Sequence, residues 1–309
     1  MTVPGSTSNL GSGFDALSAA VSLYLRVEAE WRADSGVRWP RDWTLPAADN
    51  AILRGLERGL TELGRPLPGL EFRVVNEIPL QRGLGSSGAA FVAGLRLAEV
   101  LAGESLGDQR LLELAYELEG HPDNVAASLL GGWVLSWTEG ARVRAIRLPA
   151  RLDCRFVAVI PETMVSTSEA RAILPRSYSL EDAVFNLQRS ALLVYALMEG
   201  RGELMAEATR DRLHQAYRAR LIPGAAELLE RKELPSALGE SLLALTISGS
   251  GSTMLAVVRE AEAAPGIGAW MVETLARAGL RSEVRFLEPA ARGAVVEEPE
   301  APGEAEDGA

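Results

Sequence analysis

A glycine-rich stretch, residues 79–90, lies between a strand pattern and a helix pattern, and it constrains the fold more than any other part of the chain. The apolar residues of 70–78 predict a strand that stops at Pro79. The composition and spacing of residues 89–101 predict a helix. The chain therefore has to place a helix directly after a strand, with a tight glycine turn between them.

This strand–turn–helix order has the features of an anion site. Gly83 and Gly85 permit a tight turn whose backbone can approach a ligand without a Cβ in the way. Free amides at the start of a helix favour negative charge, and Ser86 and Ser87 add hydroxyls that can bind a phosphate oxygen or a magnesium ion. The sequence predicts a phosphate-binding loop here, with an ordinary capped helix as the structural alternative.

Strand and helix patterns alternate through both halves of the chain. Polar residues around Pro149 separate the halves between residues 149 and 154. The alternation predicts an α+β protein of two closely packed domains. Further strand patterns fall at 22–31, 133–137, 143–148, 155–160, 243–248, 254–258 and 283–287, and further helix patterns at 50–63, 111–118, 179–198 and 267–278.

Three residue types are scarce, and their scarcity excludes several kinds of site. The only lysine, Lys232, has no glycines around it, so a Walker-A loop is excluded, and a Schiff-base enzyme would have to rely on that residue alone. Two histidines and one cysteine, Cys154, are too few and too dispersed for structural zinc, and no disulfide can form within the chain. The thiol count fits a reducing compartment, and we expect a cytoplasmic protein.

The charge of the chain argues against nucleic acid as a partner. The net charge is −11, whereas binding to phosphate backbones requires a basic surface. More than half of that excess lies in residues 297–309, which are rich in Pro, Gly, Ala and Glu and are predicted to form a disordered acidic tail. The apolar runs are far too short to cross a bilayer, so no membrane partner is expected.

Three further segments carry unusual polar content. Residues 3–17 are rich in small polar side chains, and Asn9 and Asp15 there could bind an amine or hydroxyl of a substrate, or could simply shape a turn. Residues 247–253 fit either a flexible hairpin turn or a glycine loop packed against the phosphate loop. Residues 117–125 crowd three acids, an imidazole and an amide around the end of a helix, which favours a site over a plain turn.

Together these segments resemble the GHMP small-molecule kinases. Residues 79–90 are similar to the family's phosphate loop, residues 3–17 to its first motif and residues 247–253 to its third, in the family's order. Further segments resemble the homoserine kinase branch of the family: 119–125, 165–175 and 211–224. The resemblance covers nearly the whole chain apart from the tail.

The resemblance implies a fold and a reaction. The fold has an N-terminal mixed α/β nucleotide-binding domain, residues 1–152, and a C-terminal ferredoxin-like α+β domain, residues 153–296. The reaction is an ATP- and magnesium-dependent transfer of the γ-phosphoryl group to the side-chain hydroxyl of L-homoserine, a step of threonine biosynthesis. Family analogy also implies a homodimer.

The resemblance assigns roles to residues of this chain. It makes Ser87 and Glu119 magnesium ligands and places Asn124 near the reacting hydroxyl, with Asp15 and Thr167 as further catalytic candidates. It assigns the nucleotide to Asn50, Pro79, Arg82, Gly83, Leu84, Gly85, Ser86, Ser87, Gly249 and Gly251. It assigns the amino-acid substrate to Asn9, Asp15, His121, Asp123, Arg171 and Arg218.

These assignments suit the chemistry. A zwitterionic substrate needs an anion for its ammonium group and arginines for its carboxylate, and the candidates supply both. Phosphoryl transfer depends on positioning and charge neutralisation, and no lysine is available to activate a catalytic aspartate, so we expect no strong general base. The rival readings are a kinase of the same family that acts on a mevalonate- or shikimate-like alcohol, and a catalytically silent regulator that binds nucleotide or amino acid.

Overall fold

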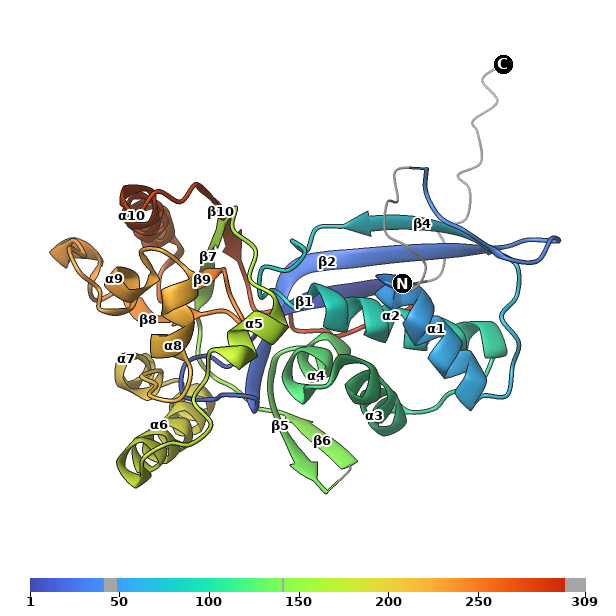
Figure 1. Cartoon of the computed structure of the whole chain (residues 1–309), viewed down its shortest axis with the longest axis horizontal. Helices are drawn as coiled ribbons and strands as arrows, with labels where there is room; N and C mark the ends of the chain where they lie inside the picture. The colour runs from blue at the N-terminus through green and yellow to red at the C-terminus, as the bar shows by residue number, and fades with distance from the viewer. Residues whose placement is uncertain (42–48, 141, 298–309) are drawn as a thin grey trace, which may run out of the picture.

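The computed structural model describes residues 1–41, 49–140 and 142–297, and it contains two β-sheets (Figure 1). The first sheet has the order β3-β4-β2-β5-β6, and β1 pairs with β2 off this path. The β3–β4 pair is parallel and the other pairs are antiparallel. Its strands are β1 (Thr2–Ser8), β2 (Leu17–Trp31), β3 (Val37–Arg38), β4 (Leu70–Asn76), β5 (Trp133–Glu139) and β6 (Arg142–Arg147).

Helices cover one face of the first sheet (Figure 1). These are α1 (Ala51–Glu62), α2 (Ser86–Ala102), α3 (Asp108–Glu119) and α4 (Pro122–Leu130). Helix α1 approaches α2 closely because glycines face each other: a Cβ at Gly94 would lie 2.1 Å from the Ile52 carbonyl oxygen, and one at Gly55 would lie 2.6 Å from the Phe91 carbonyl oxygen. The pair holds α2 and its N-terminal glycine turn firmly against the sheet.

The second sheet is antiparallel, with the order β10-β7-β9-β8. Helix α10 packs on β7 and β10, and the chain order of strands and helices is the ferredoxin-like βαββαβ pattern that the resemblance implies. The strands are β7 (Arg155–Pro161), β8 (Leu242–Ile247), β9 (Met254–Val258) and β10 (Ser282–Leu287). The helices are α5 (Thr167–Ala172), α6 (Leu180–Glu199), α7 (Met205–Ala208), α8 (Gln215–Arg218), α9 (Ala225–Leu229) and α10 (Ala264–Arg277), with 3-10 helices at Gly202–Leu204, Ala219–Leu221, Ser236–Leu238 and Ala261–Ala263.

Strand β7 joins the two halves through its two faces. Its alternate residues Phe156, Ala158 and Ile160 belong to the large apolar core that also contains the first sheet, whereas Val157 and Val159 belong to the core beneath α10. The rings of Trp133 and Phe156 meet edge to face at 5.6 Å. The halves therefore share a continuous core.

The end of the described chain returns to the first sheet. Val295 pairs with Thr2, Pro289 pairs with Val21, and the Thr2 hydroxyl donates to Glu297 (2.9 Å). Residues 289–297 thus contact the N-terminal half although they follow the second sheet, and the division at residues 152 and 296 stays a prediction. The acidic tail beyond Glu297 lies outside the described residues.

The expected elements are present, and the structure adds β1, β3, α4, α5, α7, α8 and α9, which the sequence patterns did not predict. Helix α2 begins at Ser86, earlier than its apolar spacing indicates, because Gly85 caps it in a left-handed conformation. The polar segment near the N-terminus contains a buried strand, β1. Pro122 starts α4, at a position where a missing N–H is tolerated. No helix in the described ranges is both long and apolar enough to cross a membrane.

Candidate active site

Three of the segments that the sequence singles out, residues 3–17, 79–90 and 247–253, lie against one another. The Ser248 hydroxyl donates to the Gly83 carbonyl (2.6 Å), and the Ser6 amide donates to the Leu84 carbonyl (3.0 Å). A Cβ at Gly83 would lie 2.1 Å from the Ser248 carbonyl oxygen, so this approach needs glycine. Of the two readings of residues 247–253, the loop packed on residues 79–90 is the one observed.

The phosphate-loop candidate ends in the first turn of α2. Gly85 has φ 71°, and no side chain caps the helix, so its first amides stay available to a ligand. A Cβ at Gly85 would lie 2.0 Å from the Ser6 hydroxyl oxygen. The loop therefore presents free amides and the hydroxyls of Ser86 and Ser87 at the start of a 17-residue helix, which is the geometry of an anion site.

Ser87 and Glu119 lie side by side where α2 and α3 meet. The Ser87 hydroxyl donates to Glu119 Oε2 (2.7 Å). Burial raises the pKa of Glu119, although nearby His121 and the Ser87 hydrogen bond oppose that shift. A desolvated carboxylate beside a hydroxyl is a pair of hard oxygen donors that suits Mg²⁺, which takes one or two protein ligands and completes its shell with phosphates and water. The two residues therefore fit the metal that the family implies.

His121, Asp123 and Asn124 follow at the start of α4. His121 lies between two carboxylates, with Nδ1 3.4 Å from Asp123 Oδ1 and Nε2 3.6 Å from Glu119 Oε1. Burial opposes ionisation of Asp123, but the His121 interaction and the Asn124 amide outweigh it, so the pKa of Asp123 is lowered. The Asn124 side chain donates to Ser8 (3.2 Å) and accepts from Ser6 (2.9 Å), which fixes its orientation.

Asn9 and Asp15 come together in the turn after β1. Both have left-handed backbones, with φ 71° and φ 54°, and the Asp15 amide donates to Asn9 Oδ1 (3.0 Å). Arg171 of α5 donates to both oxygens of Asp15, at 2.8 and 3.0 Å. The two residues predicted to bind the ammonium and carboxylate groups of a substrate are therefore paired with each other in this structure.

Arg218 is a buried cation, with only 2% of its surface exposed. Its guanidinium donates to the carbonyls of Ala170 (3.2 Å) and Gly249 (2.8 Å), and no carboxylate among the described residues lies within 4.0 Å of it. Burial lowers the pKa of Arg218 from its ordinary value. A buried positive charge with only carbonyl partners is costly unless an anion binds beside it.

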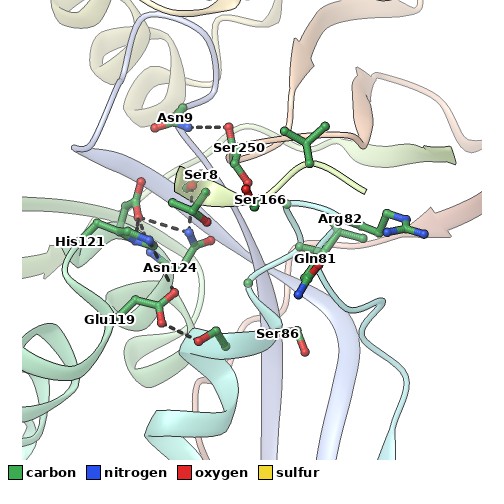
Figure 2. A pocket seen from close by; sticks show the side chains of 18 of the residues that line it. Ser8, Asn9, Gln81, Arg82, Ser86, Glu119, His121, Asn124, Ser166 and Ser250 are labelled. Carbon is green, nitrogen blue, oxygen red and sulfur yellow. Dashed lines mark hydrogen bonds and ion pairs between the residues drawn. The ribbon is translucent and has the colours of Figure 1, made fainter. Parts of the chain in front are cut away.

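These groups surround a single cavity of about 240 Å³ between the two sheets. Figure 2 shows that Glu119, His121 and Asn124 point toward one another from α3 and α4, whereas Arg82 points away from them. Arg82 donates instead to the carbonyls of Pro161 and Glu162, at 2.9 and 2.7 Å. The predicted residues that line the cavity are Asn9, Asp15, Pro79, Arg82, Gly83, Leu84, Gly85, Ser86, Ser87, Glu119, His121, Asp123, Asn124, Thr167, Arg171, Arg218 and Gly249.

Two predicted residues do not line the cavity. Asn50 is buried, and its side-chain oxygen caps α1 by accepting from the Leu53 amide (3.1 Å). Gly251 (φ 91°) packs toward Ile222, which a Cβ would approach to 2.8 Å. Their predicted contacts with nucleotide stay predictions.

The lining also contains residues that were not predicted individually: Ser8, Gln81, Val165, Ser166 and Ser250. All five lie inside segments already identified, so the segments indicate the site although these residue types alone do not. Gln81, with φ 54°, belongs to the phosphate-loop segment, and nothing in its sequence indicates that conformation.

Comparisons with known proteins agree with this geometry. Residues 50–132 match the family model of the GHMP kinases N terminal domain, and residues 193–274 match that of the GHMP kinases C terminal domain. A homoserine kinase of Thermus thermophilus is 45% identical over 86% of this chain and 89% of the relative, and that of Moorella thermoacetica is 39% identical over 95% and 98%.

The crystal structure of a homoserine kinase from Cytophaga hutchinsonii is similar along almost its whole length. It superposes with a TM-score of 0.80 and 29% identity, and it covers 94% of this chain and 95% of that one. The family models, the relatives and the fold agree from one end of the described chain to the other. The chain belongs to the GHMP kinases and, within them, to the homoserine kinase family.

Proposed function

We propose that this protein is an ATP-dependent homoserine kinase, which transfers the γ-phosphoryl group of ATP to the side-chain hydroxyl of L-homoserine. The observation that carries the proposal is Arg218, a buried arginine that has no carboxylate partner among the described residues. It lines the same cavity as the phosphate loop. A carboxylate substrate would supply the missing anion within reach of a bound phosphate.

The amino acid has a complementary partner for each of its charges. Its ammonium group would bind Asp15 and the Asn9 amide oxygen, and its carboxylate would bind Arg171 and Arg218. The substrate would therefore exchange the Asp15–Arg171 ion pair for two new ones, which preserves charge balance in a partly buried site. An alcohol without both charges would leave one of these groups unpaired, which favours homoserine over mevalonate or shikimate.

The nucleotide would bind along the phosphate loop, from Pro79 and Arg82 to Ser87, with Gly249 beside it and Asn50 and Gly251 more distant. Ser87 and Glu119 would hold Mg²⁺, which when bound neutralises charge on the phosphates. The free amides of α2 would bind phosphate oxygens, and Thr167 at the start of α5 would contact the reacting groups from the opposite wall.

The reaction needs no strong base among these residues. The lowered pKa of Asp123 makes it a weak base, and Asp15 is held by Arg171. Asn124, oriented by Ser6 and Ser8, can accept or donate a hydrogen bond at the substrate hydroxyl. The hydroxyl oxygen forms a bond to the γ-phosphorus as the bond to the β-phosphate bridge breaks, and the hydroxyl proton passes late to an oxygen of the transferred phosphoryl group.

An assay of substrate choice tests the proposal. ATP consumption is measured in a coupled assay with magnesium present, against homoserine, serine, threonine, mevalonate and shikimate. We expect turnover with homoserine to exceed that with each other alcohol by at least about 100-fold, because only homoserine places its hydroxyl and both charges correctly. Faster turnover of mevalonate or shikimate would indicate another kinase of the family, and no turnover of any of them would indicate a regulator.

Location and assembly are part of the same proposal. We infer a cytoplasmic enzyme because a chain with a single cysteine fits a reducing compartment. That thiol, Cys154, is buried, and burial raises its pKa to about 12. We infer a homodimer from membership of the family alone. Analytical ultracentrifugation over a range of protein concentrations tests the assembly.

A further inference from the structure

Phe14 lies beneath both arginines that would receive the substrate carboxylate. The guanidinium carbon of Arg218 lies 5.1 Å from the centre of the Phe14 ring, and that of Arg171 lies 5.8 Å from it. The arginines come from distant parts of the second half, in α8 and α5, whereas Phe14 belongs to the turn after β1. Phe14 does not line the cavity itself.

The placement of the two arginines poses an electrostatic problem. Both carry positive charge, and the nearby Arg171 adds to the burial that lowers the pKa of Arg218. Asp15 pairs with Arg171 but forms no ion pair with Arg218. The negative face of an aromatic ring attracts both guanidinium groups without supplying a counter-ion that would compete with a ligand.

The Phe14 ring also stacks on His214. The two rings stack with centres 4.9 Å apart and an angle of 23° between their planes. His214 Nε2 lies 2.8 Å from the Gly11 carbonyl oxygen, so this nitrogen carries the proton and donates. Gly11 must be glycine here, since a Cβ would lie 1.8 Å from the Thr209 carbonyl oxygen. These contacts hold the turn after β1 against the segment that leads into α8.

We propose that Phe14 is a positioning residue that determines specificity for the carboxylate of the substrate. Its ring, supported by His214, holds Arg171 and Arg218 together as one receptor for an amino-acid carboxylate. The proposal rests on the proposed function, since it concerns the same substrate. The role of Phe14 goes beyond the proposed function, because it assigns carboxylate recognition to a residue that touches neither substrate nor nucleotide.

The experiment compares Phe14→Leu with wild type on two acceptors. L-homoserine carries the carboxylate, and 3-aminopropan-1-ol keeps the hydroxyl and ammonium groups but lacks it. We expect the KM for homoserine to rise about tenfold in Phe14→Leu. The kcat for homoserine, the KM for ATP and the kcat/KM for 3-aminopropan-1-ol, measured from its phosphate ester by mass spectrometry, should stay within about twofold of wild type.

Two further variants control the result. Phe14→Tyr keeps the aromatic face and should restore the KM for homoserine. Phe185→Leu removes another ring with arginines over it, Arg189, Arg210 and Arg212, but on α6 outside the cavity, and should leave every constant unchanged. If Phe14→Leu does not fold, as judged by circular dichroism, Phe14→Met replaces it with a side chain of similar volume and no aromatic face.

Equal losses on both acceptors would overturn the inference, because they would mean that Phe14 supports the site as a whole. An unchanged KM for homoserine in a folded Phe14→Leu variant would overturn it as well. Failure of the proposed function is distinguishable, since wild type itself would then not prefer homoserine.

Discussion

At the scale of single residues, His214 is a fully buried histidine whose pKa predicts a dependence of stability on pH. Burial lowers the pKa of His214, nearby Arg218 adds to the shift, and Asp211 opposes it. The stability that such a histidine contributes is fully present above pH 6.5, the ordinary histidine pKa, and is lost as the pH falls below that value. The reason is that the unfolded chain then binds a proton that the folded chain does not bind. We expect the contribution of His214 to the free energy of unfolding to fall between pH 7.5 and pH 5. Burial opposes ionisation of His121, but Asp123 outweighs it and raises the pKa of His121, which therefore contributes in the opposite direction.

The variant His214→Gln isolates this effect. Glutamine keeps a donor for the Gly11 carbonyl but does not titrate. The free energy of unfolding of the variant should therefore fall less steeply with falling pH than that of wild type, by up to about 1.4 kcal/mol per pH unit. Urea unfolding at pH 7.5, 6 and 5 measures how the free energy of unfolding of each protein depends on pH. The other histidine, His121, is present in both proteins, so its titration cancels in the comparison. The same pH dependence in both proteins would contradict the prediction, because it would show that the folded chain protonates His214 as readily as the unfolded chain does.

At the scale of elements, the two ends of α2 use the same backbone conformation for different purposes. Gly85 at its start has φ 71° and ψ 24°, and Gly103 at its end has φ 66° and ψ 21°. A Cβ at Gly103 meets nothing within 4 Å, whereas one at Gly85 would displace the Ser6 hydroxyl that holds Asn124. We expect Gly85→Ala to lower kcat/KM for ATP by roughly 10- to 100-fold, because it disturbs the phosphate loop.

Gly103→Ala is the matched control. A left-handed backbone costs a residue with a side chain about 1–2 kcal/mol, so Gly103→Ala should lose that much stability in urea unfolding. Gly85→Ala should lose more, because its Cβ also meets the Ser6 hydroxyl. Gly103→Ala should keep wild-type kinetics. Similar kinetics in the two variants would mean that residues 83–87 do not form the nucleotide site.

At the scale of the whole molecule, the shared core makes the two halves unfold together. Phe156 is fully buried on the face of β7 that meets the first half, where it contacts Trp133. We expect Phe156→Ala to lower the free energy of unfolding by about 3–5 kcal/mol and to leave one transition in calorimetry, because both halves lose the same contact.

Phe286→Ala provides the comparison on the same sheet. Phe286 lies on β10 with 57% of its surface exposed, so its loss should change the free energy of unfolding by no more than about 0.5 kcal/mol. Two separate transitions in Phe156→Ala would show that the halves are independent and would contradict the shared core.

The sequence by itself determined many of the local elements and the chemistry of the segments that carry the site. Apolar spacing locates α1, α6 and β7 to within a few residues, because the periods of helices and strands are properties of the local chain. Glycine spacing and the helix that follows it predict the anion site at residues 83–87 for the same reason. The scarcity of lysine, histidine and cysteine limits the chemistry before any fold is known.

Only the tertiary structure decided which of these local features meet. Residues far apart in the chain meet where 247–253 pack on the phosphate loop, where Asp15 pairs with Arg171 and where two arginines lie over the Phe14 ring. Such contacts depend on how two sheets close over a common core, and no local pattern encodes that closure. The physical reason is range: periodicity and turn chemistry act over a few residues, whereas the site is assembled from α5, α8 and the β1 turn across the whole molecule.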